Sequence, residues 1–331
     1  MKAIYLLIAS IFIFTGCSQR VAVTSFKPAE VNEATNMKKI SVLGFSNDRI
    51  GFASQLETEL SKKTVNGQKY FTVLNRNEVN SIIDEQKFQH SGLVDKDTSV
   101  KLGKILGING IISGDVLVAD MNKSYYNTER YECLDKKCKE KRYYLVSCVR
   151  ANYDLSVSIR LTDVEKGTIV YADTLSKGSY DTHCRDRSGG LSSFGSVMTD
   201  LTDDIVTSFM TKISPTKVRR SVELLDDPEI KYTDKQEQLL EYSLEHISDN
   251  RLDKAEQLLS ELLGSTNDKC YVAAYNLGVV KETQGDYKLA RQLYELADSL
   301  TIKPNKTISN AVMRIKKQIN DKKLVNLQLG K

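Results

Sequence analysis

The side chains best suited to chemistry in this chain are its six cysteines. Four of them fall in one stretch, at Cys133, Cys138, Cys148 and Cys184. In an oxidising compartment we expect these four to form two disulfides, and the sequence leaves all three pairings open. A metal cluster is the alternative, because His183 precedes Cys184, yet no Cys-x-x-Cys pair with ligand spacing is present. The residues therefore favour disulfides and predict no metal site.

Cys17 has a different chemistry, which its N-terminal neighbours indicate. Lys2 is followed by an apolar run over residues 3–14, which is too short to span a bilayer but has the length of a signal-peptide core. The run ends in Phe14-Thr15-Gly16-Cys17, which resembles the bacterial lipobox. In that motif the thiol accepts a diacylglyceryl group and the cysteine becomes the new N-terminus. A plain signal peptide with an incidental cysteine is the alternative.

Lipidation of Cys17 would decide where the protein works. Several acyl chains, palmitate among them, hold a protein on a membrane stably without a spanning helix. In lipoproteins that this segment resembles, an Asp after the cysteine retains the protein at the inner membrane. Here Ser18 follows. We therefore expect a lipid anchor in the outer membrane, with the protein facing the periplasm.

The usual motifs of enzymes are missing from the sequence. There is no Gly-rich phosphate loop, no Gly-x-Ser-x-Gly and no His-Glu-x-x-His. The three histidines, His90, His183 and His246, show no triad spacing. The sequence predicts a protein that is not an enzyme and has no cofactor; a hydrolase is the alternative, although its reactive group cannot be located.

Composition fits an ordinary globular protein with two domains. Apolar residues make up 40% of the chain and aromatic residues 8%, enough to build cores. The net charge of +4 is small, and no concentrated basic face indicates nucleic acid. The densest basic run, residues 136–142, is interpreted as the solvated tip of a hairpin.

After a signal peptide (1–16) and a flexible tether (17–36), residues 37–215 are predicted to form an α/β layer. Strands are expected at 39–45, 71–74 and 108–118. Helices are expected where apolar residues recur at helical spacing. These positions are Phe52, Leu56 and Leu60; Val79, Ile82 and Ile83; Leu102, Ile105 and Leu106; and Val197, Leu201, Ile205, Phe209 and Ile213.

The middle of this layer is predicted to be antiparallel sheet. Residues 125–133 and 143–148 flank the charged run, as the arms of a long β-hairpin would. The next segment, residues 153–161, alternates strictly between apolar and polar residues, which is typical of a strand with one buried face. A turn at Lys166-Gly167 then leads to a partner strand over residues 168–173.

Beyond a charged linker (216–228), residues 229–331 read as all-helical, with two segments related by a 35-residue offset. In the second, residues Tyr275, Leu277, Gly278, Gly285, Tyr287, Ala290, Tyr294 and Ala297 have tetratricopeptide spacing. A plain helical extension is the alternative. Tyr275, Tyr287 and Tyr294 are the weak candidates for partner binding, although tyrosines at such positions more often pack between helices. Val312, Ile315 and Ile319 would close the stack.

The order of several segments from residue 39 to about 213 resembles the curli secretion lipoprotein family, the CsgG family. The segments are the lipobox, Lys39–Phe45, Phe71–Arg76 leading into Ile82–Gln86, Gly107–Gly114, and the strand ending Arg160–Val164. The resemblance implies a CsgG-like α/β (α+β) domain followed by tetratricopeptide-like repeats. Family members form rings in which each protomer contributes two amphipathic hairpins to a shared barrel.

Two stretches depart from that pattern. Residues 120–150 carry Lys123, Glu129, Arg130 and Glu132, and a second hairpin between Ser179 and Ser193 would be short. The sequence thus favours the periplasmic part of the fold without the barrel. We expect a role in assembly or secretion of a surface structure, through envelope protein partners or homo-oligomers. A secretion channel and a lipoprotein regulator of a peptidoglycan synthase are the alternatives.

Overall fold

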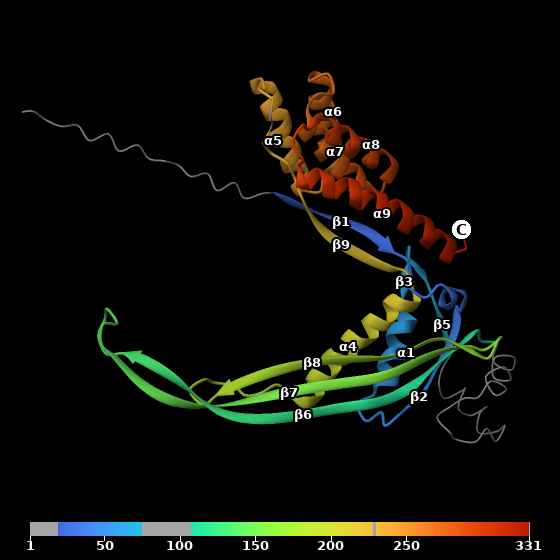
Figure 1. Cartoon of the computed structure of the whole chain (residues 1–331), viewed down its shortest axis with the longest axis vertical. Helices are drawn as coiled ribbons and strands as arrows, with labels where there is room; N and C mark the ends of the chain where they lie inside the picture. Colours follow the sequence, from blue (N-terminus) through green and yellow to red (C-terminus); the bar gives the residue numbers. More distant parts are fainter. Residues whose placement is uncertain (1–18, 75–106, 228–229, 331) are drawn as a thin grey trace, which may run out of the picture. The chain divides into compact units, whose positions relative to one another are not determined.

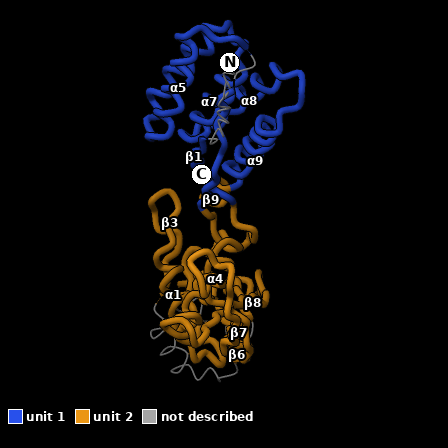
Figure 2. Tube along the Cα trace, turned by 90° about the vertical axis from the view of Figure 1, so that its left-hand side faces the viewer, with its two compact units in different colours: residues 1–27, 217–324 blue, residues 28–216, 325–331 orange. Residues whose placement is uncertain are grey.

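The computed structural model describes residues 19–74, 107–227 and 230–330 (Figure 1). The chain divides into two compact units, one of residues 1–27 and 217–324 and the other of residues 28–216 and 325–331 (Figure 2). Cys17, His90 and the two helices predicted between residues 75 and 106 lie outside the described residues.

The second unit is built on a five-stranded mixed sheet with the order β5-β2-β6-β7-β8. Its strands are β2 (Lys39–Ser46), β5 (Thr72–Leu74), β6 (Gly110–Cys133), β7 (Lys141–Asp163) and β8 (Thr168–Cys184). β2 pairs with β5 and β6 in parallel, whereas β7 pairs with β6 and β8 in antiparallel fashion. The unit also contains the 3-10 helix η1 (Glu33–Asn36) and two short paired strands, β3 (Thr64–Val65) and β4 (Gln68–Lys69).

Two helices supply the other half of this core. α1 (Phe52–Lys62) packs on β2, α4 (Phe194–Ile213) packs on β7 and β8, and the helices contact each other. The alternating strand predicted at 153–161 is confirmed, because Tyr153, Leu155, Val157, Ile159 and Leu161 are all buried while their neighbours are not. The predicted helical face of α4 is buried as well.

The sequence predicted two separate strands, 108–118 and 125–133, but β6 is a single strand of 24 residues. Residues 119–124 look like a break because they are mostly polar. They nevertheless pair residue by residue with 150–155 of β7, and only one register shift interrupts the ladder, between Val116 and Val118. Backbone pairing does not require apolar side chains, so the hairpin continues where the hydrophobic pattern stops.

The first unit begins with two strands that the sequence analysis missed. β1 (Arg20–Lys27) and β9 (Thr216–Glu223) form a two-stranded sheet inside the segments predicted to be a flexible tether and a linker. Those predictions are wrong for these residues. Val23 and Val222 join the buried cluster of the helical repeats, so a short strand with few apolar residues still has a core to pack on.

Five helices complete this unit and form tetratricopeptide-like repeats. They are α5 (Asp234–Ser248), α6 (Leu252–Ser265), α7 (Tyr271–Gln284), α8 (Tyr287–Leu300) and α9 (Lys306–Gln328), of which the last extends beyond Leu324 into the second unit's residues. Gly285 ends α7 in the left-handed conformation, and the Asp286 side chain then caps α8. Ile315 of α9 is buried, and Val312 and Ile319 pack partly buried on the same cluster.

No helix in the described ranges combines the length and apolar character that a membrane crossing needs.

Candidate protein-interaction surfaces

Strands β6 and β7 run on past α4 as a long hairpin, here called the β-arm and defined as residues 122–152 (Figure 1). β8 pairs with β7 from residue 148 onward, so the arm is two-stranded between that point and the hairpin tip. At the usual rise of a strand, its 12 residues on β6 span about 40 Å. β2 pairs with β6 only as far as Asp115, so the outer edge of β6 has no strand partner in the described part of the arm. The arm thus presents an open strand edge and two sheet faces.

One face of the β-arm carries exposed aromatic and apolar side chains. Tyr131 lies directly opposite Tyr143, with ring centroids 5.9 Å apart, and Glu129 lies opposite Leu145. The exposed fractions are 79% for Tyr125, 71% for Leu145, 58% for Tyr143 and 53% for Tyr131. These residues have odd numbers in a continuous register, so they share one face. Tyrosines of this kind are enriched in protein interfaces.

Two disulfides staple the arm. Cys133 is bonded to Cys138 across the hairpin tip, and Cys148 of β7 is bonded to Cys184 at the end of β8. This settles the three pairings that the sequence left open. By the chain-entropy relation the first contributes about 2 kcal/mol and the second about 4 kcal/mol. Cys184 is therefore unavailable as a thiolate ligand beside His183, and the described residues contain no metal-binding group of three His, Cys, Asp or Glu.

Polar contacts fold the segment after β8 back onto the arm. Arg130 of β6 pairs with Asp186 at 2.7 Å, and the Arg185 backbone N–H donates to the carbonyl of Ser147. Asp181 accepts hydrogen bonds from the Ser192 backbone N–H and hydroxyl, and these contacts lower the pKa of the Asp181 carboxyl. Residues 185–193 form a connecting loop with no second hairpin, as the length of that segment suggested.

The tip of the β-arm is an ordered, basic turn. Asp135 accepts backbone hydrogen bonds from Lys139, Lys137 and Glu140, which lower the pKa of its carboxyl. The basic run therefore lies at a hairpin tip, as the sequence predicted, and its lysines are exposed.

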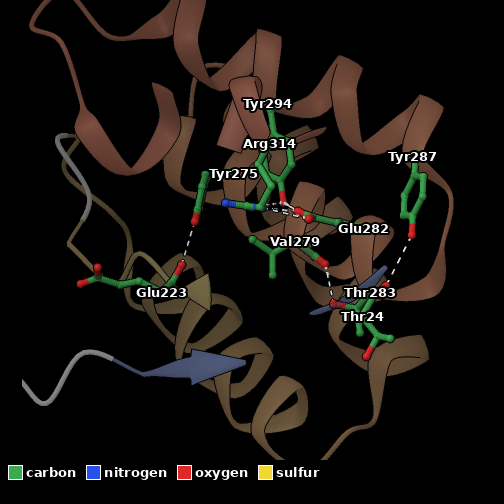
Figure 3. Close-up of polar contacts among 9 residues, drawn as sticks. All are labelled: Thr24, Glu223, Tyr275, Val279, Glu282, Thr283, Tyr287, Tyr294 and Arg314. Atoms are coloured by element: carbon green, nitrogen blue, oxygen red, sulfur yellow. Dashed lines mark hydrogen bonds and ion pairs between the residues drawn. The ribbon is translucent and has the colours of Figure 1, made fainter. Parts of the chain in front are cut away.

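In the helical unit, two of the three candidate tyrosines point inward (Figure 3). Tyr275 and Tyr294 are fully buried with ring centroids 5.5 Å apart, and the Tyr275 hydroxyl donates to the carbonyl of Glu223 at 2.8 Å. Because a buried ring cannot contact a partner, Tyr275 and Tyr294 pack between helices and are not candidates for direct partner binding. Tyr287 is partly exposed, and its hydroxyl donates to the carbonyl of Thr24.

Sequence reasoning missed a buried ion pair beside these rings. Glu282 of α7 is fully buried and accepts two hydrogen bonds from Arg314 of α9, at 2.9 and 2.8 Å (Figure 3). The Tyr294 hydroxyl donates to the same carboxylate at 2.6 Å. Burial and the Glu282 charge raise the pKa of Tyr294 well above its ordinary value. From sequence alone, a glutamate within a helix is interpreted as solvent-exposed. Only the small residue Gly278, one turn earlier in α7, indicated close packing at this position.

The remaining free cysteine in the described residues, Cys270, is buried and packed as a helix cap. Its sulfur accepts a hydrogen bond from the Ala273 backbone N–H and lies 2.7 Å from the Tyr232 hydroxyl. Nothing at this position indicates catalysis. The described surface features are the exposed side chains of the β-arm, whereas the ion pair of Glu282 and Arg314 lies within the core of the helical unit.

The chain belongs to the CsgG family. The family model described as "Curli production assembly/transport component CsgG" matches residues 15–207, which is more than half of the chain. This match covers the mixed sheet, the β-arm and most of α4. None of the curated proteins matches the sequence significantly.

Solved structures give weaker likenesses. Lipoprotein GNA1162 from Neisseria meningitidis is 14% identical, with 52% of this chain and 96% of that one covered and a TM-score of 0.26. A PelC dodecamer from Paraburkholderia phytofirmans is 12% identical, with 58% and 98% covered and a TM-score of 0.28. The protein CT253 from Chlamydia trachomatis is 11% identical, with 53% and 98% covered and a TM-score of 0.30. The family assignment therefore rests on the match to the family model and not on these structures.

Proposed function

We propose that this chain is a periplasm-facing lipoprotein, anchored in the outer membrane through Cys17, that assists assembly or secretion of a cell-surface structure. It acts through protein contacts and catalyses no reaction. The observation that carries the proposal is the stapled β-arm within a domain that matches an assembly and transport family. The arm offers an open strand edge and an exposed tyrosine face, which are the features that strand addition and interface packing use.

The disulfides support a location in an oxidising compartment. Bonds of this kind persist in oxidising surroundings and are rare in the cytosol. Both bonds lie in the arm and its neighbouring strand, so export is the condition under which the proposed contact element becomes rigid. A lipid on Cys17 would hold this element at the envelope, where its partners would be other envelope proteins or further copies of the chain.

Fractionation of cells that produce the full-length chain tests this proposal. We expect the wild-type protein to label with radioactive palmitate and to fractionate with the outer membrane. The Cys17→Ser variant should lose the label and appear in the soluble periplasmic fraction. A wild-type protein that is unlabelled and cytosolic, with reduced cysteines, would contradict the proposal.

Crosslinking in intact cells, followed by identification of the captured protein, then distinguishes the proposed role from its alternatives. Adducts with subunits or secretion proteins of a surface structure support the role proposed here. Adducts with a peptidoglycan synthase instead assign the chain to regulation of cell-wall synthesis. Detergent-stable rings that conduct ions in planar bilayers would assign it to a secretion channel, and either of these results overturns the accessory role.

A further inference from the structure

The helical unit has a hollow that the β-arm and the anchor do not explain. It has a volume of about 420 Å³ and is lined by Gly285, Asp286, Tyr287, Lys288, Arg291, Ile319 and Lys322. These residues come from the α7–α8 turn, from α8 and from α9, so the hollow lies beside the closing helix rather than among the first helices of the repeats. Its size is that of a site for one or two side chains.

The two apolar residues of the lining, Tyr287 and Ile319, are here called the floor of the hollow. Tyr287 presents its ring there, and the hydrogen bond from its hydroxyl to the carbonyl of Thr24 fixes the far end of that ring. Ile319 lies partly buried against the helical core and contributes the second apolar surface. A floor that is fixed before binding lowers the entropy cost of accommodating an apolar side chain.

The basic residues of the lining, Lys288, Arg291 and Lys322, are here called the rim of the hollow. Lys322 Nζ lies 4.9 Å from the centroid of the Tyr287 ring and donates to the carbonyl of Gly285 at 3.3 Å, which places its charge over the floor. Lys288 is exposed at the start of α8. Arg291 is already paired with Glu295 at 2.8 Å, so the two lysines carry the excess charge.

The one carboxylate in the lining, Asp286, offsets only part of this charge. Asp286 Oδ1 accepts a hydrogen bond from the Leu289 backbone N–H at 3.1 Å and serves as the cap of α8. Its carboxylate interacts favourably with the positive end of that helix but keeps its charge, so Asp286, Lys288 and Lys322 together leave one net positive charge in the lining. A ligand that enters the hollow meets an apolar surface flanked by ammonium groups.

We propose that this hollow binds an acidic segment of a partner protein, in which an aromatic or aliphatic side chain is flanked by carboxylates. The apolar side chain contacts Ile319 and Tyr287 beside the Lys322 ammonium, and the carboxylates lie against Lys288 and Lys322. Charge complementarity selects this occupant over a basic or neutral segment. The inference rests on the proposed role in assembly or secretion through protein contacts but depends only on the helical unit, so failure here leaves the β-arm proposal untouched.

Two adjacent lysines of α9 allow a matched test. Lys322 lines the hollow, whereas Lys323 does not, and both are exposed on the same helix. The full mature protein is titrated into a fluorescein-labelled peptide of Glu, Asp, Phe and Leu, and fluorescence anisotropy is recorded. We expect saturable binding that Lys322→Glu weakens about tenfold, whereas Lys323→Glu changes it less than about twofold. Circular dichroism verifies that both variants are folded, and Lys322→Gln should give an intermediate loss.

Four outcomes would overturn the inference. The first is an absence of saturable binding by the acidic peptide, and the second is equal weakening by Lys322→Glu and Lys323→Glu, which indicates a diffuse charge effect. The third is equal binding of a peptide in which every Glu and Asp is replaced by Lys. Binding of anionic phospholipid vesicles that depends on Lys322, without binding of the peptide, would assign the hollow to a lipid surface and likewise overturn it.

Discussion

At the scale of single residues, the helical unit depends on a buried charge. Glu282 is enclosed by α7, α8 and α9 and receives hydrogen bonds from Arg314 and Tyr294. A carboxylate in such a place is tolerable only while its partners remain, because removal from water costs several kcal/mol. Glu282 therefore specifies which helix closes the stack, since the only cation that reaches it comes from α9 within the described residues.

Replacing Arg314 by Met should destabilise the helical unit by about 3–5 kcal/mol, because the Glu282 charge would stay buried without a counterion. The double variant Arg314→Met with Glu282→Gln should recover much of that loss. Urea unfolding followed by circular dichroism at the helix signal measures both. A loss below about 1 kcal/mol for the single variant would contradict a charge-dependent closure.

Lys38 gives the sheet unit a pH dependence that can be measured. Its ammonium lies 3.4 Å from the centroid of the Tyr70 ring, and burial lowers its pKa to about 8. Between pH 8 and the ordinary lysine pKa near 10.5 the folded state is neutral while the unfolded state still holds the proton, so stability rises with pH in that window. Because Lys38 is partly exposed, we expect a gain of only about 1 kcal/mol from pH 7.5 to 9.5.

The variant Lys38→Met is the control for this prediction. Urea midpoints of the wild type and the variant at the two pH values give the comparison. The wild-type midpoint should rise more than the variant midpoint, which keeps a smaller rise because burial also lowers the pKa of Lys63. Equal rises in both proteins would show that Lys38 is not responsible. Burial raises the pKa of Tyr70, which adds an opposite slope only above pH 10.

At the scale of elements, the sheet depends on one close approach between β6 and its neighbours. A Cβ on Gly114 would lie 2.0 Å from the carbonyl oxygen of Ser158 and 2.6 Å from the Phe45 ring. Gly44, on the adjacent strand β2, has nothing within 4 Å of the same position. The two glycines therefore separate a steric requirement from a general preference for glycine in the sheet.

We expect Gly114→Ala to lower the stability of the sheet unit by about 3 kcal/mol or to prevent folding, since backbone cannot move aside cheaply. Gly44→Ala should change stability by less than about 1 kcal/mol. Thermal unfolding of the two variants compares them directly. Similar losses in both would mean that the contact at Gly114 does not limit the packing.

The elements that sequence predicted well are those with a strong hydrophobic period. The alternation over residues 153–161 and the helical spacing of α4 each arise from burial on one face. The repeat around Tyr275 lies on α7, where residues 272–280 are all buried, and its signal is the spacing of small and bulky residues between packed helices. β1 and the middle of β6 have no such period, because their pairing is a property of backbone contacts with residues far along the chain. The disulfide pairing follows from the β7–β8 register, in which Cys148 faces Cys184, and register is not visible in spacing.

At the scale of the whole molecule, the chain combines a stapled arm with a helical repeat unit. The bond between Cys148 and Cys184 closes a separation of 36 residues, whereas the tip bond closes one of 5. The double variant Cys148→Ser with Cys184→Ser should therefore lose about 3–4 kcal/mol, and the corresponding tip variant about 2 kcal/mol. Urea unfolding of both under oxidising conditions checks the order, and a larger loss for the tip variant would contradict it.

We expect the exposed face of the β-arm to contact another protein at the envelope. A photo-crosslinking amino acid placed at Leu145 in the full-length chain, in intact cells, tests this most directly. Ile302 is the matched control, because it is fully exposed but lies in the helical unit. We predict a discrete adduct with an envelope protein or a second copy from position 145 and none from position 302. No adduct from position 145, or the same adducts from both positions, would contradict the claim.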